Sequence, residues 1–130
     1  MDGALAMIFL DTHIVVWLYS GYFEKLSEKA KQLMEVEELL ISPMVILELQ
    51  YLFEINRIKV ASLEIYEDLH FNIGLRLDET PWSCIIKQSL SINYTRDPFD
   101  RLIIAHAQVS KSKLITKDEN ILSQYNQALW

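Results

Sequence analysis

The sequence contains few of the residues that build several common kinds of reactive or cross-linked site. A single cysteine, Cys84, excludes an internal disulfide and a zinc site made of cysteines. The three glycines are isolated, so no glycine-rich loop is available to hold phosphate groups. No Gly-x-Ser-x-Gly segment presents a serine nucleophile. A disulfide-stabilised fold, a phosphate-binding loop and a serine hydrolase site are therefore excluded.

Basic residues are also scarce. Lys and Arg number 12 against 18 Asp and Glu, which gives a net charge of −6. Proteins that bind nucleic acid through a broad surface are normally basic, so any such contact must be local or mediated by a metal ion. The first apolar run has no basic residue before it and is interrupted by Asp11 and His13, unlike a signal peptide or a membrane-spanning helix. Together with the single cysteine, this pattern predicts a cytoplasmic protein with no membrane contact.

The length of 130 residues is that of one domain. A second methionine, Met7, stands directly before the first strand-like residues, so we interpret residues 1–6 as an upstream start or an added segment. We expect a single domain over residues 1–130.

Short apolar runs that suit buried strands alternate with amphipathic segments that suit helices. The predicted strands are residues 7–10, 39–42, 75–79 and 113–117, with 127–130 as a fifth strand at the edge. Two helices are expected to begin at a capping residue followed by proline, Ser42-Pro43 and Asp97-Pro98. The alternation predicts a three-layer α/β/α sandwich with a central, mostly parallel sheet of four to five strands.

Acidic residues stand close to the ends of these apolar segments. Asp11 follows the first strand, Asp118 follows the fourth, and Glu48 and Asp100 are expected in the first turns of helices that begin near the same edge. Because ligands bind beyond the carboxyl ends of parallel strands, the four carboxylates are predicted to gather there. Buried carboxylates need a partner, and Mg²⁺ or Mn²⁺ prefers oxygen ligands. We therefore infer a divalent metal site.

Each acid also has a structural alternative. Asp11, Asp97 and Asp118 can cap the helices that follow them, and for Asp97, directly before Pro98, the cap is the favoured interpretation. Glu48 lies in a largely apolar helix, so its alternative is a buried salt bridge. Without metal, the like charges should repel one another and raise at least one pKa.

Four segments together resemble the PIN-domain family, and within it the VapC-type toxin ribonucleases. They are IFLDTHIVVWL, ISPMVILELQYL, DPFDRLIIAHA and LITKDENILSQY, in the order and spacing of that family. The resemblance implies cleavage of RNA with Mg²⁺ or Mn²⁺ bound by the catalytic acids Asp11, Glu48, Asp100 and Asp118, with Asp97 as an outer member of the cluster. It also implies a homodimer and a small antitoxin protein that lies across the active cleft.

Polar neighbours of these acids are candidates for contact with the RNA substrate. They are Thr12, Arg96, Arg101, Thr116 and Lys117, of which the three basic residues adjoin an acidic position. Basic side chains there can hold phosphate groups, and local charge balance is the alternative. Glu119 is an alternative to Asp118 as a metal ligand. His13, Trp17 and Trp130 are interpreted as packed or surface residues, since such roles are commoner than contact with a base.

Two other functions remain open at this point. A catalytically inactive PIN-like module would bind RNA or protein without cleavage. A receiver-like signalling domain shares the parallel sheet and the acidic Mg²⁺ pocket, and Lys117 fits its late lysine loosely, but the expected pair of acids before the phosphorylated aspartate is missing. The sequence therefore favours a metal-dependent endoribonuclease.

Overall fold

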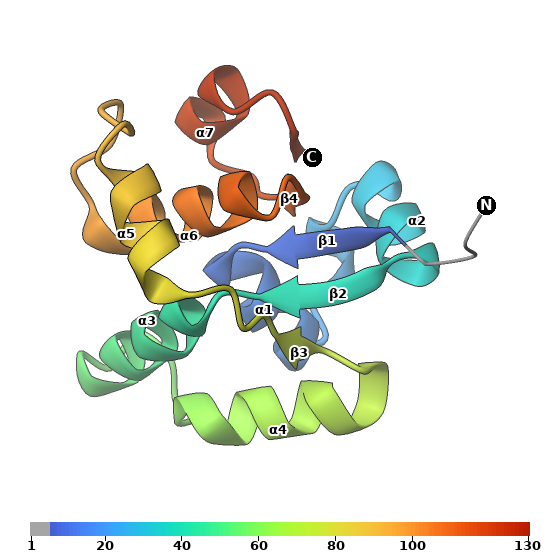
Figure 1. Ribbon diagram of the computed structural model, residues 1–130. Coiled ribbons are helices and arrows are strands. Elements are labelled where there is room, and N and C mark those ends of the chain that lie inside the picture. Colours follow the sequence, from blue (N-terminus) through green and yellow to red (C-terminus); the bar gives the residue numbers. More distant parts are fainter. Residues whose placement is uncertain (1–5) are drawn as a thin grey trace.

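Five strands form one parallel sheet in this computed structural model, which describes residues 6–130 (Figure 1). They are β1 (Met7–Leu10), β2 (Glu38–Ile41), β3 (Arg76–Leu77), β4 (Lys113–Ile115) and β5 (Ala128–Leu129), in the order β3-β2-β1-β4-β5. The predicted parallel sheet is confirmed, and every pairing is parallel. The expectation about residues 1–6 lies outside the described residues except at Ala6, whose carbonyl accepts a hydrogen bond from the N–H of Glu38.

Helices connect the strands and cover both faces of the sheet. They are α1 (Thr12–Ser20), a 3-10 turn at Phe23–Lys25, α2 (Glu28–Val36), α3 (Pro43–Glu54), α4 (Ser62–Ile73), α5 (Trp82–Ser89), α6 (Pro98–Val109) and α7 (Glu119–Gln124). The chain steps in one direction from β1 to β3 and returns past β1 to reach β4. Right-handed crossovers therefore place α1 to α4 on one face and α5 and α6 on the other, which is the predicted three-layer arrangement.

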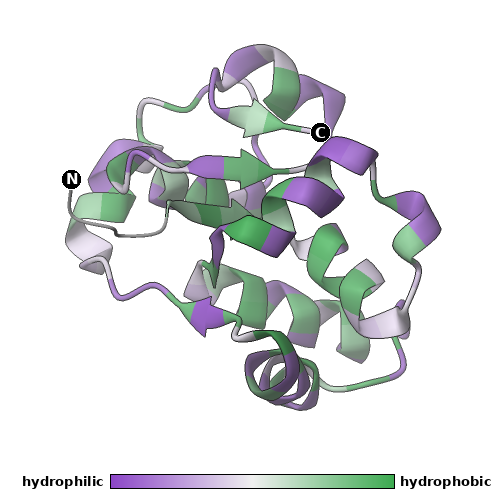
Figure 2. Cartoon of the chain, turned by 90° about the vertical axis from the view of Figure 1, so that its right-hand side faces the viewer, coloured by the Kyte–Doolittle hydropathy of each residue, from purple (hydrophilic) through white to green (hydrophobic). Residues whose placement is uncertain are grey.

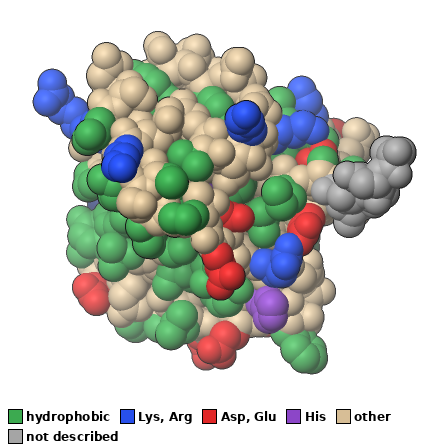
Figure 3. All heavy atoms as spheres, viewed as in Figure 1, with side chains coloured by type: hydrophobic (Ala, Val, Ile, Leu, Met, Phe, Trp, Pro, Cys, Tyr) green, Lys and Arg blue, Asp and Glu red, His purple; other side chains and the backbone are tan. Residues whose placement is uncertain are grey.

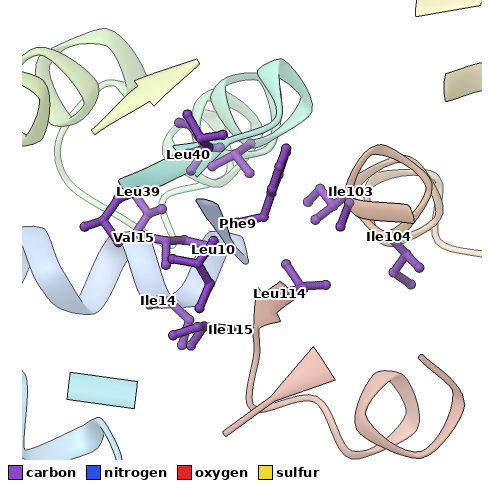
Figure 4. Close-up of a cluster of buried hydrophobic side chains, with 14 of the residues drawn as sticks. Phe9, Leu10, Ile14, Val15, Leu39, Leu40, Ile103, Ile104, Leu114 and Ile115 are labelled. Carbon is purple, nitrogen blue, oxygen red and sulfur yellow. The ribbon is translucent and has the colours of Figure 1, made fainter. Parts of the chain in front are cut away.

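Alternate residues of β1 reach the two helical layers. In Figure 4, Phe9 points toward Ile103 of α6, whereas Leu10 lies on the side of Ile14 in α1. All four side chains are buried. Successive side chains of a strand point to opposite faces, so an unbroken apolar strand requires cover on both sides. Figure 2 shows the outer helices banded with hydrophilic and hydrophobic residues, as expected of helices with one buried side.

Capping side chains begin several helices, as the sequence predicts. The hydroxyl of Ser42 accepts from the N–H of Met44 at 3.1 Å, ahead of Pro43 at the first position of α3. Asp97 caps α6 in the same way ahead of Pro98. Ser42 thus begins α3 instead of ending β2, so the second strand stops one residue earlier than predicted.

Three strands are shorter than predicted, and one of them is β5, which spans Ala128–Leu129 instead of 127–130. β3 spans Arg76–Leu77 instead of 75–79, because the side chain of Asp78 turns to Thr80 and to Nε2 of His106, 2.7 Å away. β4 ends at Ile115 instead of residue 117. Within residues 6–130, no helix has the length and apolar character needed to cross a membrane.

Candidate active site

A hollow of about 460 Å³ lies at the carboxyl edge of the sheet, beyond the ends of β1 and β4. The residues that line it are Asp11, His13, Trp17, Glu48, Asp97, Asp100, Lys117, Asp118 and Glu119. The fold therefore brings together all five acids named from the sequence, with Glu119 beside them. Glu48 lies in the second turn of α3 and not in the first, since five residues of the helix precede it after its predicted start at Pro43.

Threonine hydroxyls connect and orient two of the acids. Oδ2 of Asp11 accepts from the hydroxyl of Thr116 at 2.7 Å, and Oε1 of Glu48 accepts from the hydroxyl of Thr12 at 2.5 Å. The two acids are only 7% and 9% exposed, so these bonds supply the partners that buried carboxylates require. Both threonines are fully buried, so their contact with a substrate stays a prediction that this geometry does not support. Their position instead holds Asp11 and Glu48 in place.

Three of the aspartates are also helix caps. Asp11 accepts from the N–H of Thr12 at 2.8 Å, Asp97 accepts from the N–H of Phe99 at 2.8 Å, and Asp118 accepts from the N–H of Ile121 at 3.0 Å. The capping alternative is therefore confirmed for all three. Each cap bond uses Oδ1. Capping thus leaves Oδ2 of each carboxylate outside the cap bond. In Asp11 this oxygen also accepts from Thr116 and keeps a second lone pair, so capping and ligand binding are compatible.

Asp100 differs from Asp11, Glu48, Asp97 and Asp118, because none of residues 6–130 donates a hydrogen bond to its carboxylate. Burial, followed by the negative charges of Asp11, Asp97 and Glu48, raises the pKa of Asp100 to about 7. This is the effect expected of crowded carboxylates without a cation. Burial also raises the pKa of Asp11 and of Glu48, and the threonine hydroxyls partly offset that rise.

The donor set suits a hard divalent cation, because it consists of carboxylate oxygens that repel one another without one. Within the described part of the chain, no group of three acidic, histidine or cysteine side chains is arranged to hold a metal ion by itself. Mg²⁺ does not need such a group, since it keeps several waters and often takes only one or two carboxylates directly. The residues therefore fit Mg²⁺ or Mn²⁺, with Asp11 and Asp100 as the central candidates for ligands.

Of the three basic residues predicted to hold phosphates, only Lys117 lines the hollow. Arg101 follows Asp100 on α6, and its guanidinium donates to the carbonyl of Ser89 at the end of α5, 3.0 Å away. Arg96 is exposed and lies outside the lining. Phosphate binding by these two arginines stays a prediction that the geometry does not support.

Two residues of the hollow, His13 and Trp17, are ones that the sequence predicts to be packed or at the surface. His13 and Trp17 both line it, and their rings are 6.5 Å apart between centroids. Their spacing of four residues places them on one side of α1, which is the sequence signal that identifies such a pair. The contact of Trp17 with Trp130 has no comparable signal, since the two lie near opposite ends of the chain.

Comparisons with known proteins agree with this geometry. Residues 8–126 match the family model described as PIN domain. Ribonuclease VapC22 of Mycobacterium tuberculosis is 30% identical over 125 residues, which cover 92% of each chain. A toxin–antitoxin complex from Klebsiella pneumoniae shares the fold with a TM-score of 0.66 and 19% identity, over 95% of this chain and 96% of that chain. VapBC2 from Rickettsia felis, bound to a promoter DNA fragment, shares the fold with a TM-score of 0.63 and 20% identity, over 95% of this chain and 97% of that chain. The chain therefore belongs to the PIN-domain family, among the VapC-type proteins.

Proposed function

We propose that this protein is a divalent-metal-dependent endoribonuclease and acts as the toxin of a toxin–antitoxin pair. The observation that carries the proposal is the acidic hollow, where Asp11, Glu48, Asp97, Asp100 and Asp118 lie together. Within residues 6–130, none of these acids forms an ion pair with Lys or Arg. Such a cluster attracts a divalent cation, and the relative VapC22, a ribonuclease by name, supports RNA as the substrate.

The side chains around the hollow have separable tasks in this proposal. The carboxylates of Asp11, Glu48, Asp100 and Asp118 would hold Mg²⁺ or Mn²⁺. When bound, the ion polarises the phosphodiester and lowers the pKa of its bound water. Thr12 fixes the orientation of Glu48 by its hydrogen bond. Helices α1, α6 and α7 all begin at the hollow, so their N-terminal dipoles partly offset the negative charge of the acids.

The direct test is cleavage of a labelled single-stranded RNA by the purified protein in Mn²⁺. Asp11→Asn and Asp100→Asn should each lower the rate by about 100-fold or more, because the charge that holds the ion is reduced. Asp68→Asn, which changes an exposed carboxylate of α4, is the matched control and should leave the rate unchanged. Cutting that survives both substitutions at the hollow would contradict the proposal. Binding of Mn²⁺ and RNA without any cutting would identify an inactive module instead.

Two protein contacts belong to the same proposal. The related structures named above include toxin–antitoxin complexes, which supports a small antitoxin whose basic arm fits the acidic hollow. A homodimer is supported by exposed apolar side chains of α3, Leu47 and Tyr51, and of its C-cap residue, Ile55. Figure 3 shows hydrophobic side chains gathered in this region. Light scattering should give a dimer that Leu47→Glu weakens, and a monomeric wild type would contradict this part.

The proposal also includes the organisation and the compartment expected from the sequence. Residues 1–130 would act as one domain in the cytoplasm, where the RNA substrate is available and a thiol such as that of Cys84 stays reduced. Limited proteolysis tests the first point, since one domain should be cut only near its ends or within exposed loops.

A further inference from the structure

A cluster of aromatic rings and lysines borders the acidic hollow. We call it the aromatic–lysine rim, and it consists of Trp17, Tyr22, Lys25, Lys117 and Trp130. The rings of Trp17 and Trp130 meet edge to face with 6.0 Å between centroids. Nζ of Lys117 lies 5.8 Å from each of these two centroids. Residues from the two ends of the chain thus build one surface, and its members Trp17 and Lys117 also line the hollow.

The second lysine of the rim has a similar environment. Nζ of Lys25 lies 5.6 Å from the ring centroid of Trp17 and 5.1 Å from that of Tyr22. Within residues 6–130, neither Lys25 nor Lys117 forms an ion pair, although six acids line the hollow beside Lys117. Both lysines are exposed. Contacts of exposed ammonium groups with rings are weak, so the two lysines can move onto an arriving anion at little cost.

We propose that the aromatic–lysine rim binds an unpaired stretch of RNA next to the bond that is cut. A base would stack on the rings of Trp17 and Trp130, and neighbouring phosphates would contact Lys117 and Lys25. Proteins bind single-stranded nucleic acid by this combination of ring faces for bases and basic side chains for the backbone. The inference rests on the proposed endoribonuclease function and names its substrate class as single-stranded RNA or an RNA loop.

The rim also accounts for how so acidic a chain can approach RNA. The net charge of −6 repels a polyanion at long range, and the hollow itself concentrates negative charge. Beside the hollow, two lysines that form no ion pair within residues 6–130, together with rings on which a base can stack, give a local attraction that does not depend on the overall charge. A duplex cannot use it fully, because its bases are already stacked and paired inside the helix.

The test measures binding separately from cutting. Anisotropy of a short, fluorescently labelled single-stranded RNA is followed in EDTA at low salt. Trp130→Leu should weaken binding by about 5-fold or more through lost stacking, and Lys117→Gln should weaken it by about 3-fold and reduce its salt dependence. Trp130→Phe and Lys117→Arg should retain most of the affinity. The matched controls Trp82→Leu and Lys87→Gln, at exposed positions of α5, should bind like the wild type.

The outcomes separate this inference from the proposed function. Unchanged affinity in both Lys117→Gln and Trp130→Leu would overturn the rim as an RNA surface, even if the wild type cuts RNA in Mn²⁺. Loss of affinity in a protein that never cuts RNA would refute the proposed function and leave the rim as a binding surface. Equal affinity for a duplex of the same sequence would overturn the assignment to unpaired RNA. Should Trp130→Leu fail to fold, the exposed Lys117 still decides the question.

Discussion

The two edges of the sheet treat acidic residues in opposite ways. At the amino edge, Glu37 pairs with Lys113 at the start of β4, with 2.8 Å between Oε1 and Nζ, and Glu38 pairs with Arg76 at the start of β3. At the carboxyl edge, six acids line one hollow, and within residues 6–130 none of them is paired with Lys or Arg. Acidic residues are therefore paired with basic residues at the amino edge, and are left without such partners at the carboxyl edge.

The difference shows which acids destabilise the fold. An ion pair at the amino edge stabilises both partners modestly, whereas crowded carboxylates without a cation destabilise one another. Lys117 could neutralise part of the hollow, but its ammonium lies over the rings of Trp17 and Trp130. Such an uncompensated cluster is expected where binding of a cation repays the cost.

The largest effect is expected at the carboxyl edge, from a substitution that removes the hydroxyl of a threonine and keeps the shape of its side chain. Thr116→Val deletes the donor to Oδ2 of Asp11 and the acceptor for the N–H of Asp118. RNA cleavage should fall about 10- to 100-fold, as is usual when the support of a metal ligand is lost. The pKa of Asp11 should rise further, because a hydrogen bond that favours its charged form disappears. Thr116→Ser keeps the hydroxyl and should cut normally; equal rates for all three proteins would exclude a positioning role.

A smaller effect is expected on the stability of the metal-free protein. The pKa of Asp100 is about 7 in the folded chain against 3.8 for the free side chain, so the charged form destabilises the fold. This penalty is absent near pH 4, grows up to about pH 7 and is constant above it. Asp100→Asn should therefore exceed the wild type in unfolding free energy by about 1–2 kcal/mol at pH 8, after allowance for solvent screening, and by little at pH 4.

Chemical denaturation in EDTA at the two pH values measures this difference. Other titrating groups, such as the buried His106, affect both proteins alike, so comparison with the variant isolates Asp100. Mg²⁺ should stabilise the wild type more than the variant, because binding to the folded state raises its stability. A variant that is less stable than the wild type at pH 8 would show that the carboxylate is not under repulsion.

The smallest effect is expected at the amino edge. Glu37→Gln removes one charge of the pair with Lys113, whose side chain is 39% exposed. Because the side chain of Glu37 is only 9% exposed, the unfolding free energy should fall by about 1 kcal/mol, the upper end of the range for exposed pairs, and RNA cleavage should stay at the wild-type rate. A loss of cleavage in Glu37→Gln would contradict the assignment of catalysis to the carboxyl edge alone.

Much of the fold could be predicted because its signals are local. Apolar runs locate the strands, and Ser42-Pro43 and Asp97-Pro98 locate the starts of two helices. The parallel order then brings the acids to one edge. The early end of β3 could not be predicted, because it depends on the contact of Asp78 with His106, which is distant in sequence.

The site could be predicted only in part for the same reason. Its acids stand next to strand and helix ends, where the sequence shows them directly. The burial of Thr12 and Thr116 could not be predicted, because polar residues are usually exposed. The aromatic–lysine rim could not be found, since it depends on β5 carrying Trp130 back to Trp17 of α1.

Because the acids at the hollow are also helix caps, the negative charge of the hollow can be changed while the starts of the helices are kept. Asn is as good a helix cap as Asp, and the caps of Asp11, Asp97 and Asp118 each use a single oxygen that an amide can replace. Replacing these residues by Asn one at a time, and then in combination, should give a graded series of proteins with the same backbone and a stepwise lower negative charge. Metal affinity could then be measured against the number of carboxylates in the hollow while all three helix caps are kept.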